Sequence, residues 1–188
     1  MGRPSNRAER RAEILRAFAV VLAEHGYAGA TIAAVATEAG IAPGLMHHHF
    51  TSKQEMLEAL LDDLIARFRD RVRHYEQGAD RLLAYVDGAL KLDEQADVVG
   101  ARCWVGLFAE AVRGPALFRQ VRRLLDTEIA TIRDRSRGRL SDQQAGAVLA
   151  FIIGALVVGA FAPRKTAGFA APGLRLLVSA LVNSAGAG

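Results

Sequence analysis

The stretch TIAAVATEAGIAPGLMHHHFTSKQEML, Thr31 to Leu57, decides the fold, because two short helical patterns meet in it at a glycine. Its apolar residues have helical spacing over 32–39, which predicts one short helix ending at Gly40. A second short helix is expected over 43–49, since its first residue is a proline and the first turn of a helix tolerates proline well. Two short helices joined by a tight turn, with a longer supporting helix before them, form a helix-turn-helix.

Apolar residues at helical spacing predict helices in the rest of the chain as well. Before the stretch, one amphipathic helix is expected over 7–25 and ends at Gly26. After it, Ser52 and Glu55 have the spacing of a capping box at the start of a long helix that reaches about Tyr75. Glycines and prolines separate five later helices, expected at 80–92, 100–112, 115–137, 141–161 and 172–182. The prediction is an all-α fold of about nine helices.

Composition narrows the class of protein further. The 188 residues are 51% hydrophobic and 23% charged, which excludes a disordered chain and provides apolar surface for a core. The single cysteine, Cys103, excludes an intrachain disulfide framework and a metal site built from several cysteines. The formal net charge of +4 is a modest basic bias that is compatible with nucleic acid. The polar N-terminus lacks the pattern of a secretory signal, so we expect a cytoplasmic protein.

One apolar run raises the alternative of a membrane span. The 18 residues over 145–162 carry no charge, which is the lower limit of length for a membrane-spanning helix. We expect instead a buried helix of a soluble protein, because the run is rich in alanine and glycine and lacks an aromatic belt. Small residues form one stripe on it, and larger apolar residues form another on the last helix. Both stripes are expected at a homodimer interface, the alternative being that they pack inside one subunit: Gly146, Ala150, Gly154, Leu174, Leu177, Val178 and Leu181.

Eight residues of the helix-turn-helix stretch have the identity and spacing of a known pattern: Thr31, Ala36, Ala39, Gly40, Gly44, Phe50, Lys53 and Leu57. In these residues the chain resembles the TetR family of bacterial transcriptional regulators, and beyond about residue 75 it is similar in length and helix number. The resemblance implies a DNA-binding domain over 1–53 and an effector-binding and dimerisation domain over 54–188. It also implies a ligand-responsive repressor that binds a palindromic operator in double-stranded DNA as a homodimer. A small-molecule effector would release that DNA.

Two positions depart from the family pattern. Ala42 stands where the family usually has a serine or threonine before the second helix, and His47 stands where it usually has a tyrosine. A histidine can still donate a hydrogen bond to phosphate. The residues expected to contact DNA are Thr31, Pro43, Gly44, Leu45, His47, His48 and Lys53. The segment Gly2-Arg3-Pro4 either reaches into the minor groove or is an ordinary solvated N-terminus.

Aromatic residues of the later helices are candidates for lining an effector cavity, although each can equally be an ordinary core residue: Phe68, Tyr85, Trp104, Phe108, Phe118 and Phe151. No metal or cofactor is expected, because consecutive histidines on a helix point about 100° apart and three of them cannot converge on one ion. No catalytic motif is recognised, so we do not expect an enzyme. The alternatives are a helical enzyme or carrier with an accidental resemblance, a membrane-anchored helix bundle, and a transcriptional activator of the same fold.

Overall fold

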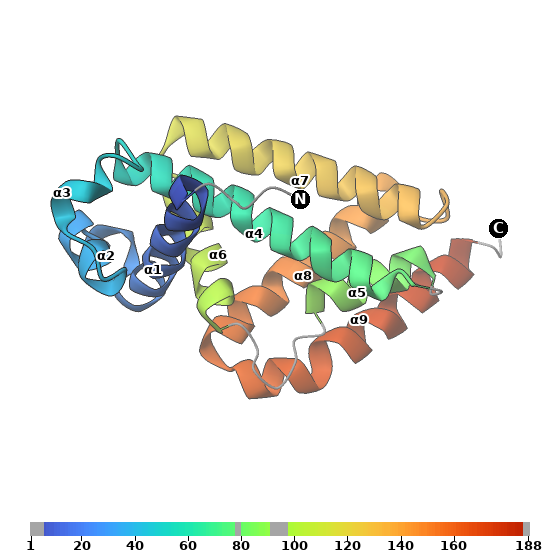
Figure 1. The fold of residues 1–188 in the computed structure, drawn as a ribbon. Helices are drawn as coiled ribbons and strands as arrows, with labels where there is room; N and C mark the ends of the chain where they lie inside the picture. The colour runs from blue at the N-terminus through green and yellow to red at the C-terminus, as the bar shows by residue number, and fades with distance from the viewer. Residues whose placement is uncertain (1–5, 78–79, 91–97, 186–188) are drawn as a thin grey trace.

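The computed structural model describes residues 6–77, 80–90 and 98–185, and the regular elements in these ranges are all α-helices (Figure 1). In chain order they are α1 (Asn6–Gly29), α2 (Ile32–Glu38), α3 (Pro43–Met46), α4 (Lys53–Tyr75), α5 (Arg81–Leu90), α6 (Val98–Ala111), α7 (Pro115–Arg135), α8 (Asp142–Phe161) and α9 (Pro163–Ala185). The expected all-α fold of nine helices is confirmed over the described residues. The N-terminal segment Gly2-Arg3-Pro4 lies outside them, and so does Leu92, the expected end of the fifth helix.

Helices α1, α2 and α3 gather at one end of an elongated molecule (Figure 1). Helix α4 begins beside them and runs along the molecule, with α7 above it and α8 and α9 below it in this view. The buried side chains form two cores. The first core joins α1–α3 and the first half of α4 to α6 and the start of α7, and the second joins the end of α4 to α5, α7, α8 and α9. Helix α4 therefore connects the two cores.

Helix α4 contributes to both cores along one continuous helix. Leu57 and Leu60 are buried in the first core, and Val72 is buried in the second. The contact between α4 and α5 depends on Gly88, since a Cβ atom there would lie only 2.6 Å from the Cα atom of Val72. Any larger residue at this position would push α5 away from α4.

The start of α4 differs in one detail from the expected capping box. The Ser52 hydroxyl oxygen accepts a hydrogen bond from the amide of Glu55 at 3.0 Å, as expected. The Glu55 carboxylate, however, accepts hydrogen bonds from the amide and the hydroxyl of Thr51, at 2.7 and 2.8 Å. It also accepts one from Arg11 of α1 at 3.1 Å. This carboxylate therefore connects the preceding turn and α1 to the start of α4.

The last helix is longer than the sequence pattern predicted. Helix α9 begins at Pro163 and continues through Pro172, where the start of a helix was expected. Pro163 occupies the first helical position, where an N–H group would have no intrahelical partner. Pro172 lies in the interior, where a proline costs about 3 kcal/mol. Residues on both sides of it, Ala171 and Leu174, are buried in the second core, and this packing keeps the helix continuous.

Helices α8 and α9 are long and apolar enough to cross a bilayer, by length and composition alone. Inside the protomer, 39% of the apolar window of α8 and 28% of that of α9 are buried. This is weak evidence for a membrane span, because an apolar core helix of a soluble protein has the same composition. Both helices contribute to the second core, and each also presents an outer face.

Candidate functional site

Helix α3 is held in place by residues on its inner side and by the turn before it. With four residues, it is too short to be stable alone. Met46 and Phe50 are buried in the first core together with Val35 of α2. Gly40 makes the turn between α2 and α3 with a φ of 65°, a conformation that residues with side chains rarely adopt. The position of α3 is therefore set by the core and the turn.

The outer side of α3 is open to solvent. Five of the expected DNA-contact residues lie exposed on this side and on the turn that follows: Pro43, Gly44, Leu45, His47 and His48. Leu45 is 50% exposed and offers an apolar surface of the kind that contacts a thymine methyl group. Ala42 precedes the helix and makes no side-chain capping bond, since it lacks the hydroxyl that the family usually has there.

The other two expected contact residues lie at helix starts nearby. Thr31 is exposed and caps α2, with its hydroxyl oxygen accepting a hydrogen bond from the amide of Ala34 at 3.1 Å. Lys53 is half-buried, and its Nζ donates to the carbonyl oxygen of Tyr27 at 2.6 Å and lies 4.1 Å from the centre of the Tyr27 ring. Lys53 therefore ties α4 to the end of α1, and its ammonium has further N–H donors beyond this bond.

Arg11 has a positioning role that the sequence did not indicate. Its guanidinium donates to the carbonyl oxygen of His49 and to the carboxylate of Glu55, and it lies 3.9 Å from the centre of the Phe50 ring. These contacts fix the end of the α3 segment against α1 and α4. The hydrogen-bond partners are 38 and 44 residues away in the sequence, so no local pattern could have identified them.

The three consecutive histidines have different surroundings. His47 and His48 are exposed, whereas His49 is half-buried. Burial lowers the pKa of His49, and the nearby charges of Arg7 and His48 lower it further. The neutral form of His49 is therefore favoured next to α1, and the outward histidines are the two that can meet a ligand.

A cavity of about 70 Å³ lies where α4, α5, α6, α7 and α8 meet. Four of the six aromatic candidates line it: Phe68, Tyr85, Trp104 and Phe108. The rings of Phe68 and Tyr85 pack edge to face with their centroids 5.3 Å apart. Those of Trp104 and Phe108 stack with centroids 5.6 Å apart. The structure thus brings side chains from three helices to one site.

The other two aromatic candidates lie elsewhere. Phe118 is 49% exposed on the outer side of α7. Phe151 is half-buried on α8 and faces α9, where a Cβ atom at Gly173 would lie 3.9 Å from its ring. Neither residue is among those that line the cavity.

Two charged side chains, Arg71 and Glu128, also line the cavity, and sequence reasoning missed both. Glu128 is 7% exposed and accepts a hydrogen bond from the Tyr85 hydroxyl at 2.7 Å. Burial, and then the charge of Glu128, raises the pKa of Tyr85, so its hydroxyl stays protonated and donates. One signal could have identified Glu128, since it lies on the apolar stripe of α7 between Val121 and Ile132.

The outer sides of α8 and α9 leave apolar side chains in solvent. We call the following residues the α8–α9 surface: Ala150, Gly154, Val157, Val158, Phe161, Phe169 and Leu177. Phe161 is 82% exposed. Of the other expected interface residues, Gly146 and Leu181 are half-buried, and Leu174 and Val178 are buried in the second core.

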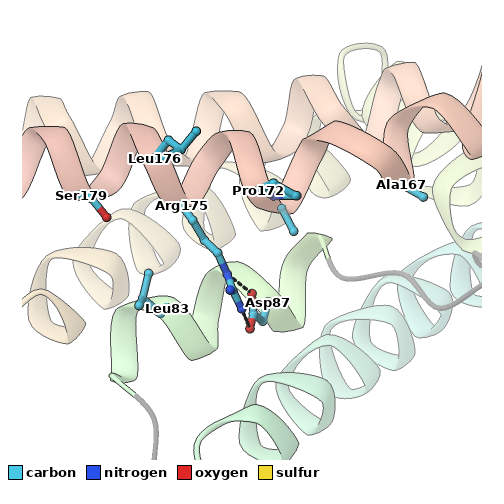
Figure 2. A pocket seen from close by; sticks show the side chains of 8 residues that line it. Leu83, Asp87, Ala167, Pro172, Arg175, Leu176 and Ser179 are labelled. Atoms are coloured by element: carbon cyan, nitrogen blue, oxygen red, sulfur yellow. Dashed lines mark hydrogen bonds and ion pairs between the residues drawn. The ribbon is translucent and has the colours of Figure 1, made fainter.

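A second hollow, of about 540 Å³, lies between α5 and α9 (Figure 2). Arg175 of α9 reaches across it to Asp87 of α5, with Nε donating to the carboxylate at 2.8 Å and a second nitrogen donating to the other carboxylate oxygen. The hydrogen bond to Asp87 raises the pKa of Arg175. Leu83 and Pro172 are among the apolar residues that line the hollow. The ion pair fastens α9 to α5.

Comparison with known proteins supports the same assignment. The family model of the bacterial regulatory proteins, tetR family, matches residues 14–60, which include α2 and α3. The HTH-type transcriptional regulator BetI of Escherichia coli O127:H6 is 33% identical over 156 residues, which are 78% of this chain and 80% of that protein. BetI of Escherichia coli K12 is 34% identical over 158 residues, with the same shares covered. The chain belongs to the TetR family.

Solved structures have the same fold. A transcriptional regulator from Rhodococcus sp. Rha1 superimposes with a TM-score of 0.81 at 24% identity, covering 93% of this chain and 96% of that chain. A TetR-family regulator from Rhodococcus sp. has a TM-score of 0.78 at 28% identity, covering 93% and 99%. A regulator from Saccharomonospora viridis, solved in complex with choline, has a TM-score of 0.74 at 23% identity, covering 92% and 96%. The protein is a ligand-responsive DNA-binding transcriptional regulator, as the sequence indicated.

Proposed function

We propose that the protein is a repressor that binds a palindromic operator as a homodimer and leaves it when a small molecule occupies the cavity between α4 and α8. The exposed outer side of α3 carries this proposal, because its inner side is fixed by Met46 and Phe50 while its outer side contacts nothing else in the described chain. A helix presented in this way at one end of a molecule can enter the major groove (Figure 1). Repression is the typical role in the family.

The bases are read from the middle of the α3 surface. Leu45 contacts a thymine methyl group, and His48 hydrogen-bonds to a base edge. Pro43 and Gly44 at the start of the helix are exposed and small, so the backbone can approach the DNA closely there.

Phosphates are contacted from the borders of this surface. Thr31 uses its hydroxyl oxygen as an acceptor for the α2 cap, and its O–H group donates to a phosphate oxygen. His47 donates from the turn after α3, and Lys53 uses the N–H groups that its bond to Tyr27 does not occupy. These contacts position the protein on the duplex without carrying sequence information themselves.

The α8–α9 surface is the proposed dimer interface. Contiguous exposed apolar residues on two neighbouring helices mark a surface that another protein covers. Antiparallel packing of both helices against their copies gives a four-helix contact with two-fold symmetry. Two-fold symmetry is what a reader of a palindrome requires. The dimer would place one α3 from each protomer on the DNA.

Helices α4 and α6 connect the cavity to the DNA-binding end. Phe68 of α4 and Trp104 of α6 line the cavity. The opposite side of α6 packs on α1, where the Cys103 thiol donates to the carbonyl oxygen of Ala19 at 3.3 Å and Gly106 faces Leu22. An occupant that displaces the two rings shifts both helices against the first core. The spacing of the two α3 helices in a dimer then changes, and DNA is released.

Selection of bound sequences from random duplex DNA tests the proposal most directly. We expect the full-length protein to enrich a palindrome whose half-sites lie about one helical turn apart. The logarithm of the binding constant should then fall linearly with the logarithm of the salt concentration. Enrichment of an asymmetric site would contradict the homodimer, and the absence of any salt-dependent affinity for DNA would contradict the repressor.

The remaining classes are separated by simple measurements. The family role is regulation of transcription, and we infer that the protein is not an enzyme and acts in the cytoplasm. Recovery of the whole protein in the soluble fraction without detergent supports this, and a requirement for detergent would favour a membrane-anchored bundle of α8 and α9. In vitro transcription from a template with the selected operator distinguishes a repressor, which lowers transcript yield, from an activator, which raises it.

A further inference from the structure

Two carboxylates are buried in the described part of the protein, and they are balanced differently. Asp87 is held by two hydrogen bonds from Arg175. Glu128 is equally buried, but among the described residues it has no cationic side chain within ion-pair distance, and its hydrogen bond comes from the neutral Tyr85 hydroxyl. Burying a charge without an opposite charge is costly. The Glu128 carboxylate is therefore balanced only when a positive group lies beside it.

The walls around Glu128 suit a positive group without a hydration shell. Tyr85, which donates to the carboxylate, is packed edge to face on Phe68, and the stacked rings of Trp104 and Phe108 line the same cavity. The faces of aromatic rings attract cations, more strongly where water is excluded. The other charged lining residue, Arg71, donates its Nε to the Gly88 carbonyl oxygen at 3.1 Å.

We propose that this cavity binds a compact organic cation of the alkylated ammonium class, with its charge against Glu128 and its alkyl groups against the aromatic rings. The proposal rests on the effector role of the cavity and names the class of effector. The volume of about 70 Å³ corresponds to several water molecules, which suits a small cation and not a molecule of several fused rings. Tyr85 positions the carboxylate, and Glu128 selects for positive charge.

Binding is measured with two probes of similar shape that differ in charge. Tetramethylammonium chloride supplies the cation, and 2,2-dimethylpropan-1-ol supplies a branched neutral molecule, with sodium chloride added to match ionic strength. Trp104 is the only tryptophan in the chain, so its fluorescence reports occupation of the cavity. We expect the cation to bind about tenfold more tightly than the alcohol, since removing the charge removes about 1.4 kcal/mol or more of attraction.

Glu128→Gln keeps the shape and the acceptor for Tyr85 but removes the charge. In this variant we expect the preference for the cation over the alcohol to disappear. The matched control is Glu110→Gln on α6, whose carboxylate pairs with Arg113 outside the cavity, and it should keep the preference. If Glu128→Gln does not fold, Phe68→Leu serves instead, because loss of a ring face should weaken cation binding more than alcohol binding. Equal affinity of the two probes for the wild-type protein overturns the proposal.

Operator binding is measured on the same samples so that the two proposals fail separately. Wild-type protein that binds its operator but does not prefer the cation overturns the cation site and leaves the repressor intact. Cation binding that requires Glu128 but does not weaken operator binding supports the site and overturns its role as effector site. Cation binding that also releases operator DNA supports both.

Discussion

Helices α3 and α8 are opposite solutions to exposing a helix on a protein surface. Helix α3 has four residues, presents histidines around one exposed leucine, and is held by a core that other helices supply. Helix α8 has 20 residues and leaves valines and a phenylalanine in solvent. A polar surface on a helix fixed from behind suits a polar ligand such as DNA, whereas an apolar outer face on a long helix suits another protein. Changes in the two regions should therefore fail in different ways.

The largest effect is expected from Ala150→Arg on the α8–α9 surface. Ala150 is exposed in the protomer, so the arginine does not disturb the cores, but in the proposed dimer it becomes a buried unpaired charge that costs several kcal/mol. We expect a folded, helical monomer whose operator binding is weaker by about 100-fold or more. Sedimentation velocity and circular dichroism measure the two properties.

Ala66→Arg is the matched control for this variant, because Ala66 is exposed on α4 outside the α8–α9 surface. It should remain dimeric. The α8–α9 interface is wrong if the wild-type protein sediments as a monomer at micromolar concentration while it still binds a full palindrome tightly.

The next effect is expected on the α3 surface, where Leu45→Ala and His48→Ala should change what the protein reads. Each side chain is exposed, so the melting temperature should stay unchanged. Loss of one base contact typically costs about 1–3 kcal/mol at one base step, and the preferred operator sequence should change at that step. Repeated selection with each variant measures this. The same operator preference in both variants would show that these residues do not read bases.

A smaller effect is expected behind the α8–α9 surface, from Arg175→Met. The change removes both hydrogen bonds to the buried Asp87 carboxylate. Because the Arg175 side chain is 44% exposed, solvent screening reduces the loss to about 1–2 kcal/mol of unfolding free energy. Urea denaturation measures it, with Arg164→Met on the exposed side of α9 as the control. Equal stability of the two variants would mean that the ion pair does not fasten α9 to α5.

A uniform and modest effect on DNA binding is expected from Lys53→Ala. Loss of one phosphate contact should weaken binding to all sequences about equally and reduce the salt slope by roughly one. The bond from Lys53 to Tyr27 allows a purely structural role, but such a role would leave the salt slope unchanged. Lys53→Arg keeps the charge and should keep the slope. A loss confined to specific DNA would contradict the phosphate contact.

The smallest effect concerns pH at the junction of α1 and α4. Hydrogen bonds from Thr51, and then the charge of Arg11, hold the pKa of Glu55 below its usual value. A carboxylate with a lowered folded pKa stabilises the protein above its unfolded pKa of about 4.3, and this contribution is lost as the pH falls through the folded value. Urea midpoints from neutral to acid pH should therefore fall less steeply for Glu55→Gln than for the control Glu9→Gln. Parallel curves would contradict the assignment.

The sequence predicted the parts of the fold that depend on neighbouring residues. Helical spacing, prolines at helix starts and Gly40 at the turn act over a few residues, so the helix-turn-helix and its outward residues could be identified in advance. The pattern misplaced the start of α9, because burial of Ala171 and Leu174 outweighs the local cost of Pro172. Aromatic residues of the later helices could be named as candidates, but which of them share a cavity could not.

The sequence by itself therefore determined the helical class, the family resemblance and the reading surface of α3. Only the tertiary structure decided that Arg11 fixes the α3 segment, that Glu128 and Tyr85 meet across 43 residues of sequence, and that Leu174 faces inward while Leu177 faces solvent. The physical reason is range. Helix propensity and turn geometry are set by adjacent residues, whereas burial and charge pairing depend on which helices pack together, and that is fixed by the whole chain.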